Sequence, residues 1–150
     1  MLLNELFVDL IGVPHVTDGR DPKVGLDCYG LVLEASRRIG YFAPDYNDPA
    51  FVGGEIDCVG FIDNYKVQID KLSDKENDLP YVKIEKPEPG CMVLLIYIHP
   101  YATHIGIVLD DCDHFIHAAS KNKAVCIEKL SSISWRHRIK GFYKWTKRLN

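Results

Sequence analysis

Apolar residues recur every three or four positions in two stretches of the first half of the chain, which is the spacing of a helix with one buried face. The first stretch covers residues 3–11 and stops at Gly12 and Pro14. The second covers residues 61–72. The pattern predicts a helix in each stretch, and the glycines and prolines of residues 13–25 predict a loop after the first.

A third helix is predicted between Asp27 and Gly40. Asp27 suits a helix N-cap, because its carboxylate can accept from the free backbone N–H groups of the first turn, and Gly40 suits a helix end. Cys28 stands at the start of this helix and lies in line with its apolar stripe, which consists of Leu31, Val32, Ala35 and Ile39. The Cys28 side chain is therefore expected to face the body of the protein.

After residue 80 the pattern changes to short apolar segments separated by turn residues, which predicts strands. The continuous apolar run over residues 91–97 suits a central strand. The other predicted strands lie around Val82 and Ile84 and over residues 103–109, 115–118, 125–127 and 139–145. Helices followed by strands are typical of an α+β fold, with an antiparallel sheet packed against the earlier helices.

Length and charge narrow the class of protein. The 150 residues, 47% of them hydrophobic, predict a single domain over residues 1–150. With 18 basic and 21 acidic residues, a nucleic-acid binder that relies on a broad positive surface is not expected. Residues 1–6 lack a basic leader and contain an acid, so we expect neither a signal peptide nor a membrane span, and synthesis in the cytoplasm.

The cysteines predict reduced thiols and no metal site. They are odd in number and form no CxxC pair, which argues against a disulfide framework or a structural zinc site. They stand at positions 28, 58, 91, 112 and 126. One metal-binding alternative stays open, because Cys112, His114 and His117 lie close together in the sequence.

Cys28 is the candidate nucleophile. A thiol in the first turn of a helix lies at the positive end of the helix dipole, where a thiolate is stabilised. The alternative is a buried cysteine that acts only as a small hydrophobic residue. A nucleophile also needs a base, so the choice between the two depends on the histidines.

His104 and His117 are the candidate partners of Cys28. If residues 110 and 111 form a two-residue turn, or Val108 and Asp113 close a four-residue loop, the hairpin register places the two histidines directly opposite each other, with Cβ atoms about 4.5–5.5 Å apart. We predict that His104 is the general base and that His117 holds its tautomer. The remaining histidines, at positions 15, 99, 114 and 137, have no such relation and are expected to be structural.

Motifs along nearly the whole chain resemble the NlpC family of cysteine peptidases. They are Gly12-Val13-Pro14, Gly19-Arg20-Asp21-Pro22, Asp27-Cys28-Tyr29-Gly30-Leu31-Val32, Pro89-Gly90, His104-Ile105-Gly106-Ile107-Val108-Leu109, Phe115-Ile116-His117-Ala118 and Gly141-Phe142-Tyr143. The resemblance implies a reduced papain-like α+β fold and places Cys28, His104 and His117 at the catalytic positions. The lead-in at 19–22, Tyr29 and the closing Gly-Phe-Tyr look most like the branch found in phage and prophage tails.

The chain departs from the family pattern at three positions. Tyr29 stands where the cell-wall enzymes usually have serine, His15 replaces an aromatic residue, and Cys91 replaces an acid. The first two bear on the substrate pocket and the oxyanion site. Asp27, Tyr29 and His15 are therefore candidate substrate-binding or oxyanion residues, beside the backbone N–H of Cys28.

The resemblance implies a thiol hydrolase without a cofactor that cleaves amide bonds in the peptide stems of bacterial peptidoglycan. Its implied setting is a phage tail, with the stem peptide and tail proteins as partners. Two alternatives stay open. One is a structural tail or cell-wall-binding module that keeps the fold with weakened chemistry, and the other is an acyltransferase or amidase that acts on a lipid or small molecule.

Overall fold

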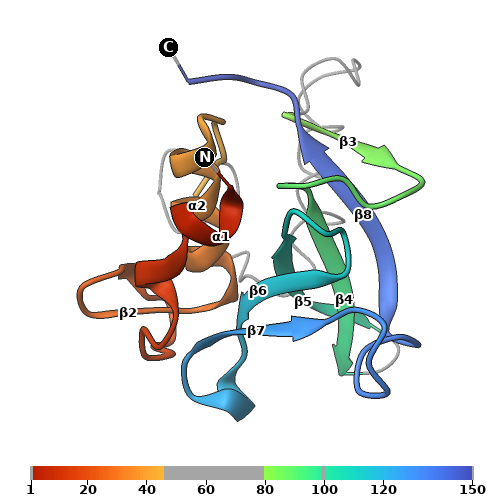
Figure 1. The fold of residues 1–150 in the computed structure, drawn as a ribbon. Helices are drawn as coiled ribbons and strands as arrows, with labels where there is room; N and C mark the ends of the chain where they lie inside the picture. The colour runs from red at the N-terminus through yellow and green to blue at the C-terminus, as the bar shows by residue number, and fades with distance from the viewer. Residues whose placement is uncertain (1, 46–79, 99–100, 150) are drawn as a thin grey trace.

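The computed structural model describes residues 2–45, 80–98 and 101–149. The helix predicted over residues 61–72 lies outside them, as do Cys58 and His99. In Figure 1 the N-terminal helices lie on one side of the molecule and most of the strands on the other. In chain order the elements are α1 (Leu3–Leu6), η1 (Val8–Leu10), β1 (Arg20–Asp21), β2 (Gly25–Leu26), α2 (Cys28–Ile39), β3 (Tyr81–Ile84), β4 (Met92–Ile98), β5 (Tyr101–Val108), β6 (His114–Ala118), η3 (Ser120–Asn122), β7 (Val125–Lys129) and β8 (Ile139–Trp145).

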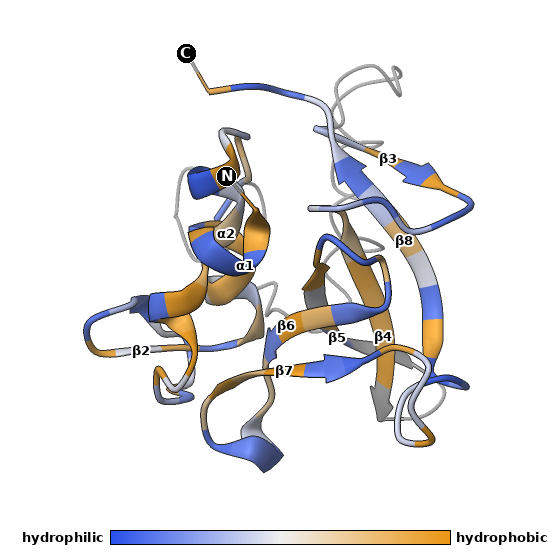
Figure 2. Ribbon diagram, viewed as in Figure 1, coloured by the Kyte–Doolittle hydropathy of each residue, from blue (hydrophilic) through white to orange (hydrophobic). Residues whose placement is uncertain are grey.

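The main sheet confirms the predicted α+β class. Its six strands are ordered β3-β8-β4-β5-β6-β7, and every neighbouring pair is antiparallel. Each predicted strand of the described residues is present, with ends that move by a few residues at most. The apolar run predicted to be central forms β4, which lies between β8 and β5. Figure 2 shows β4 as mostly hydrophobic, whereas β3 at the sheet edge alternates with hydrophilic residues.

Helix α2 begins and ends where its caps predict. The Asp27 carboxylate accepts from the Gly30 backbone N–H at 2.7 Å and from the Arg20 guanidinium at 2.8 Å. Its second oxygen accepts from the Asp18 backbone N–H at 3.1 Å. Gly40 closes the helix in the left-handed conformation, with φ of 102°, which a residue with a side chain rarely adopts. Asp27 therefore fixes both the loop before Cys28 and the first turn that carries it.

Asp27→Ala should lower the free energy of unfolding by about 1–2 kcal/mol, because an N-cap is lost and Arg20 loses a buried partner. Chemical denaturation monitored by circular dichroism measures the change. Asp21→Ala is the matched control, since among the described residues the exposed Asp21 carboxylate accepts a hydrogen bond only from the nearby Lys23 backbone N–H. A midpoint for Asp27→Ala that equals that of the control would contradict this role.

The N-terminal segment differs from its prediction. A continuous helix over residues 3–11 is wrong, because Phe7 leaves helical geometry at φ −109° and ψ 4°, and a 3-10 turn follows. The break lets both Phe7 and Leu10 point into the core, where they are 1% and 0% exposed. The predicted loop over residues 13–25 also contains the short antiparallel ribbon of β1 and β2, which period-2 patterning cannot reveal in strands of two residues.

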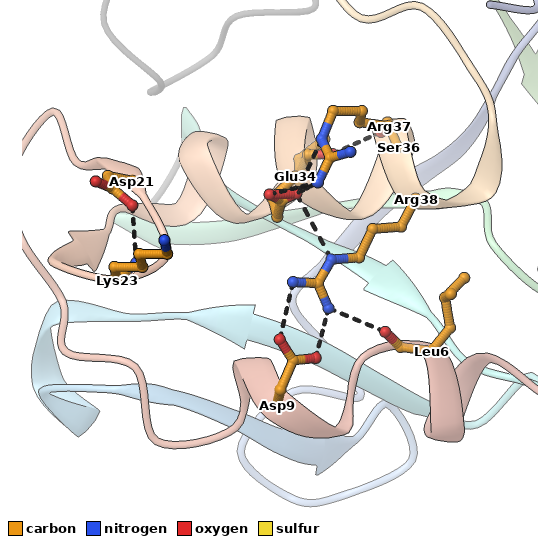
Figure 3. Close-up of polar contacts among 9 residues, drawn as sticks. Leu6, Asp9, Asp21, Lys23, Glu34, Ser36, Arg37 and Arg38 are labelled. Carbon is orange, nitrogen blue, oxygen red and sulfur yellow. Dashed lines mark hydrogen bonds and ion pairs between the residues drawn. The ribbon is translucent and has the colours of Figure 1, made fainter.

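Arg38 attaches this segment to α2. Its guanidinium donates to both carboxylate oxygens of Asp9, at 2.5 and 2.9 Å, and to the Leu6 carbonyl at 3.0 Å. It also lies 3.6 Å from the Glu34 carboxylate one turn earlier in α2. Figure 3 shows this arrangement, with Arg38 between the two acids. A bidentate pair of this kind fixes the orientation of the N-terminal turns as well as their position.

Alternation along the strands divides the apolar residues into two clusters. The cluster shared with α2 contains Leu31 of the helix together with Ile105 and Ile107 of β5. The second cluster contains Val108 and Trp135, with Phe115 of β6. Since successive residues of a strand face opposite sides, His104 and His117 are placed on the side of the second cluster. Trp135 is fully buried at 1% exposure and packs against both histidines.

Candidate active site

His104 and His117 meet in a buried hydrogen bond. Nε2 of His104 lies 2.7 Å from Nδ1 of His117, and the residues are 4% and 0% exposed. The predicted direct opposition is wrong. Leu109 and His114 close a four-residue turn, and β5 pairs with β6 two positions away from the predicted register. Because the shift is even, both rings stay on one face and meet diagonally.

Gly106 makes the diagonal contact possible. Continuing the observed register, in which Ile107 pairs with Ile116, places Gly106 opposite His117. A Cβ atom at Gly106 would lie 3.2 Å from the Cβ of His117 and 2.9 Å from the Ile116 carbonyl oxygen. With hydrogen in that place, the ring of His104 reaches across to His117. Glycine is thus needed at this position of the His-Ile-Gly-Ile motif, because a side chain would occupy the space in which the two histidines meet.

Glu128 is the third member of this chain of contacts, and the sequence reasoning missed it. Its Oε2 lies 2.6 Å from Nε2 of His117, and its side chain is 28% exposed. In β7, Cys126 pairs directly with His117, so Glu128, two residues further on, shares the same face. An acid directly after the predicted strand over residues 125–127 was the available signal. It could be interpreted only once the register of β6 and β7 was known.

The charge states of His117 and Glu128 determine which ring nitrogens of the two histidines carry protons. Burial lowers the pKa of His117 to about 4, against the raising effect of Glu128, so the ring is neutral at neutral pH. Burial raises the pKa of Glu128, but His117 and Trp135 bring it below its ordinary value, so this carboxylate is ionised. An ionised carboxylate only accepts, and Nε2–H of His117 must therefore donate to it. We assign the remaining tautomers from this network.

A lone pair is consequently left on Nδ1 of His104. With its proton on Nε2, His117 has an unprotonated Nδ1, which accepts from Nε2–H of His104. His104 then carries its single proton on Nε2, and its Nδ1 is unprotonated and can act as the base. Burial lowers the pKa of His104 well below its ordinary value, and the His117, His15 and Lys121 side chains act in the same direction. The arrangement is that of a neutral base held in one tautomer.

Aromatic rings hold both imidazoles in place. The Trp135 ring stacks on His104, with centroids 5.8 Å apart at 23°, and meets His117 edge-on, with centroids 5.4 Å apart at 88°. Phe115 also packs against His117, with ring centroids 4.5 Å apart. Lys121 lies over the Trp135 ring, its Nζ 4.6 Å from the centroid. Locked rings of this kind preserve the geometry that proton transfer requires.

Stability should fall as the pH drops from about 6.5 to about 4. Over this pH range a histidine in the unfolded protein becomes protonated, whereas His117 and His104 in the folded protein stay neutral. The unfolded state therefore binds more protons than the folded state. Each such histidine contributes a slope of up to about 1.4 kcal/mol per pH unit. Denaturation at a series of pH values measures it. His117→Asn should reduce the slope, the exposed His137→Asn should keep it, and equal slopes in all three proteins would contradict the assignment.

Cys28 and the proposed oxyanion residues surround the start of α2. Cys28 is 5% exposed and belongs to the core cluster that α2 shares with β5. Tyr29 is fully buried, and its hydroxyl donates to the Pro44 carbonyl at 2.5 Å. Asp27 is occupied by the cap contacts described above, and His15 is half-buried and acts electrostatically on His104. Substrate contacts of Asp27, Tyr29 and His15 stay predictions, since their observed contacts are with the protein itself.

The metal alternative based on Cys112, His114 and His117 finds no support. His114 pairs with Asp111 in the β5–β6 turn, and it stands three positions before His117, which places the two on opposite faces of β6. In the part of the chain that the structure describes, the His, Cys and acidic side chains whose ligand atoms converge belong to another group, His117, Cys126 and Glu128.

A family model described as the NlpC/P60 family matches residues 12–144, which covers most of the chain. The chain belongs to the NlpC/P60 family. Its α+β architecture with an antiparallel sheet is the reduced papain-like fold of that family. NlpC/P60 members are typically cysteine peptidases and generally act as cell-wall peptidases or amidases. No curated protein matches this sequence.

Solved NlpC/P60 structures share the fold. One is a protein described as similar to a lipoprotein of the NLP/P60 family from Staphylococcus aureus, with TM-score 0.63 and 18% identity over 98% of this chain and 41% of its own. Another is NlpC2 from Trichomonas vaginalis, with TM-score 0.56 and 18% identity over 97% of this chain and 46% of its own. This chain therefore spans less than half the length of either protein. None of its described helices has the length and apolar character needed to cross a membrane.

Proposed function

We propose that this NlpC/P60 chain is a cysteine peptidase or amidase that hydrolyses amide bonds in the peptide stems of bacterial peptidoglycan. Cys28 is its nucleophile, His104 its general base and His117 the residue that orients the base. The observation that carries the proposal is the series of hydrogen bonds from His104 through His117 to Glu128. In the tautomers assigned above, this series leaves Nδ1 of His104 unprotonated. Family membership supports the substrate class.

The position of α2 supports the pairing of Cys28 with His104. The helix packs against β5, and Cys28 shares a core cluster with Ile105, the residue next to His104. The pairing of β4 with β5 shifts register immediately beside His104, between Leu95 and Ile96. Bulges of this kind are common next to active sites. Cys28 and His104 also keep a small exposed area, as reacting groups require.

The proposed reaction proceeds through a thioester. Nδ1 of His104 takes the Cys28 thiol proton, and the thiolate attacks the amide carbonyl, whose oxyanion the Cys28 backbone N–H stabilises. His117 and the Glu128 carboxylate stabilise the His104 imidazolium that forms. That imidazolium protonates the leaving amine as the C–N bond breaks. His104 then removes a proton from water, which attacks the thioester and releases the acid and the Cys28 thiol.

The biological setting is the finer part of the proposal. The lead-in over residues 19–22, Tyr29 and the ending Gly141-Phe142-Tyr143 favour the phage and prophage tail branch. We propose synthesis in the bacterial cytoplasm, incorporation into a tail, and tail proteins as partners. A tail enzyme that opens stem peptides would act at the site where the tail meets the wall.

Digestion of purified peptidoglycan tests the function. Mass spectrometry of the released fragments should show new pairs of free amine and free carboxyl ends within the stem peptides for the wild type and none for Cys28→Ala. Sedimentation with the cell wall in the absence of new ends would favour the binding module instead. Cys28 labelling by a thiol reagent without cleavage would favour an acyltransferase or amidase with another substrate. Equal fragment release by both proteins would contradict the assignment of the nucleophile.

A further inference from the structure

Three metal-ligating atoms of different kinds meet behind the histidine pair. Nε2 of His117, Sγ of Cys126 and a carboxylate oxygen of Glu128 lie within 4.8 Å of one another. Nε2 of His117 is 3.5 Å from Sγ of Cys126 and 2.6 Å from Oε2 of Glu128. Because Cys126 pairs directly with His117 and Glu128 follows two residues later, the three side chains project from one face of β6 and β7.

The set fits zinc. Zinc binds thiolate at about 2.3 Å and imidazole at about 2.0–2.1 Å in tetrahedral geometry, which separates the sulfur and nitrogen by about 3.6 Å. The observed separation of 3.5 Å already matches this value. Glu128 has to move back from His117, and its side chain is partly exposed at 28%. A thiolate and a carboxylate together also balance the two positive charges of the ion. Their negative charge counters the repulsion between the ion and the neighbouring Lys121.

We propose that His117, Cys126 and Glu128 bind Zn²⁺ and that the ion switches off the proposed cysteine peptidase. The regulatory half of this inference rests on the proposed function, whereas the binding half does not. Access is through Asn122, which is exposed and whose amide nitrogen lies 2.9 Å from Sγ of Cys126 and 3.3 Å from Oε2 of Glu128. Displacing this amide opens the ligand atoms to solvent and leaves a fourth position for water.

The ion reverses the tautomers on which the base depends. Zinc on Nε2 of His117 displaces the proton from that nitrogen, so the neutral ring carries its proton on Nδ1. Nδ1–H then donates to Nε2 of His104, which must in turn carry its own proton on Nδ1. In this state His104 has no lone pair for the Cys28 thiol proton. Each histidine keeps one proton, and the single proton released to solvent comes from the Cys126 thiol.

Calorimetric titration with zinc chloride tests the site, in a Cys28→Ala background that removes the competing thiol. We expect one zinc ion per chain. Adding Cys126→Ser should weaken binding on the order of 100-fold or more, since even residues that only support a ligand contribute 10–100-fold. Adding Cys112→Ser, which changes a partly exposed cysteine outside the group, should leave binding unchanged. Glu128→Gln repeats the test where Cys126→Ser fails to fold, as judged by circular dichroism.

Equal zinc affinity with and without Cys126 would overturn the site. So would binding that the Cys28→Ala background alone removes, because the ion would then sit on the proposed nucleophile. For the regulatory half, micromolar zinc should stop hydrolysis by the wild type and by Cys112→Ser but not by Cys126→Ser, and a chelator should restore it. Inhibition that is independent of Cys126 overturns the switch. Absence of hydrolysis in chelator-treated wild type contradicts the proposed function and leaves the binding result intact.

Discussion

Cys28→Ala should lower peptidoglycan hydrolysis to the uncatalysed background, a loss on the order of 10⁴–10⁶-fold in kcat. The substitution removes the atom that forms the thioester, and the rest of the site cannot replace it. The fold should survive, because Cys28 stands in the first turn of α2, where the Asp27 cap makes the stabilising contacts. Alanine is also a good helix former at this position.

The measurement is the rate of new amine ends released from purified cell wall, with the unfolding midpoint of each variant as the check on folding. Cys112→Ala is the matched control, since it also removes a thiol, in the turn between β5 and β6. It should retain the wild-type rate. Turnover by folded Cys28→Ala at the rate of Cys112→Ala would refute the nucleophile.

His104→Ala should have an effect of similar size, and His117→Asn a smaller one. Without His104 no group accepts the thiol proton or returns it to the leaving amine. Asparagine at position 117 can still accept from Nε2–H of His104, so a measurable fraction of the rate should remain. Groups that act as one unit lose most of the rate at the first deletion, so the double variant should be little worse than His104→Ala alone.

Stepwise kinetics of the two single variants and the double variant decide these roles, in the presence of a chelator so that zinc does not contribute. A greater loss in His117→Asn than in His104→Ala would reverse the assigned roles. Strictly additive losses in the double variant would show that the two rings act separately, against the hydrogen bond of 2.7 Å that joins them.

Local signals in the sequence predicted most of the described fold. The cap at Asp27, the left-handed Gly40 and the apolar stripe between them define α2 without reference to any other part of the chain. Alternation predicted the strands, and their order after the helices predicted the class. The N-terminal prediction failed at Phe7, because burial of this side chain overrides the helical periodicity around it, and periodicity contains no information about such tertiary contacts.

The candidate site was predictable in its members but not in its geometry. His104 and His117 could be placed on one face from their spacing. Their diagonal contact depends on the length of the turn after Leu109, and several turn lengths are compatible with its acidic sequence. Glu128 depends on a second register, that of β6 and β7, and so it could not be found before the sheet was known. Each unpredicted feature is thus a pairing between strands rather than a property of one strand.

The most direct test of the central claim, that His104 activates the Cys28 thiol, is the rate of Cys28 alkylation by iodoacetamide as a function of pH. Mass spectrometry of the peptide that contains Cys28 separates this thiol from the other four cysteines. We predict that the wild type reacts rapidly at neutral pH and that His104→Ala reacts slowly there, with its profile moved to higher pH. Identical profiles for the two proteins would contradict the account.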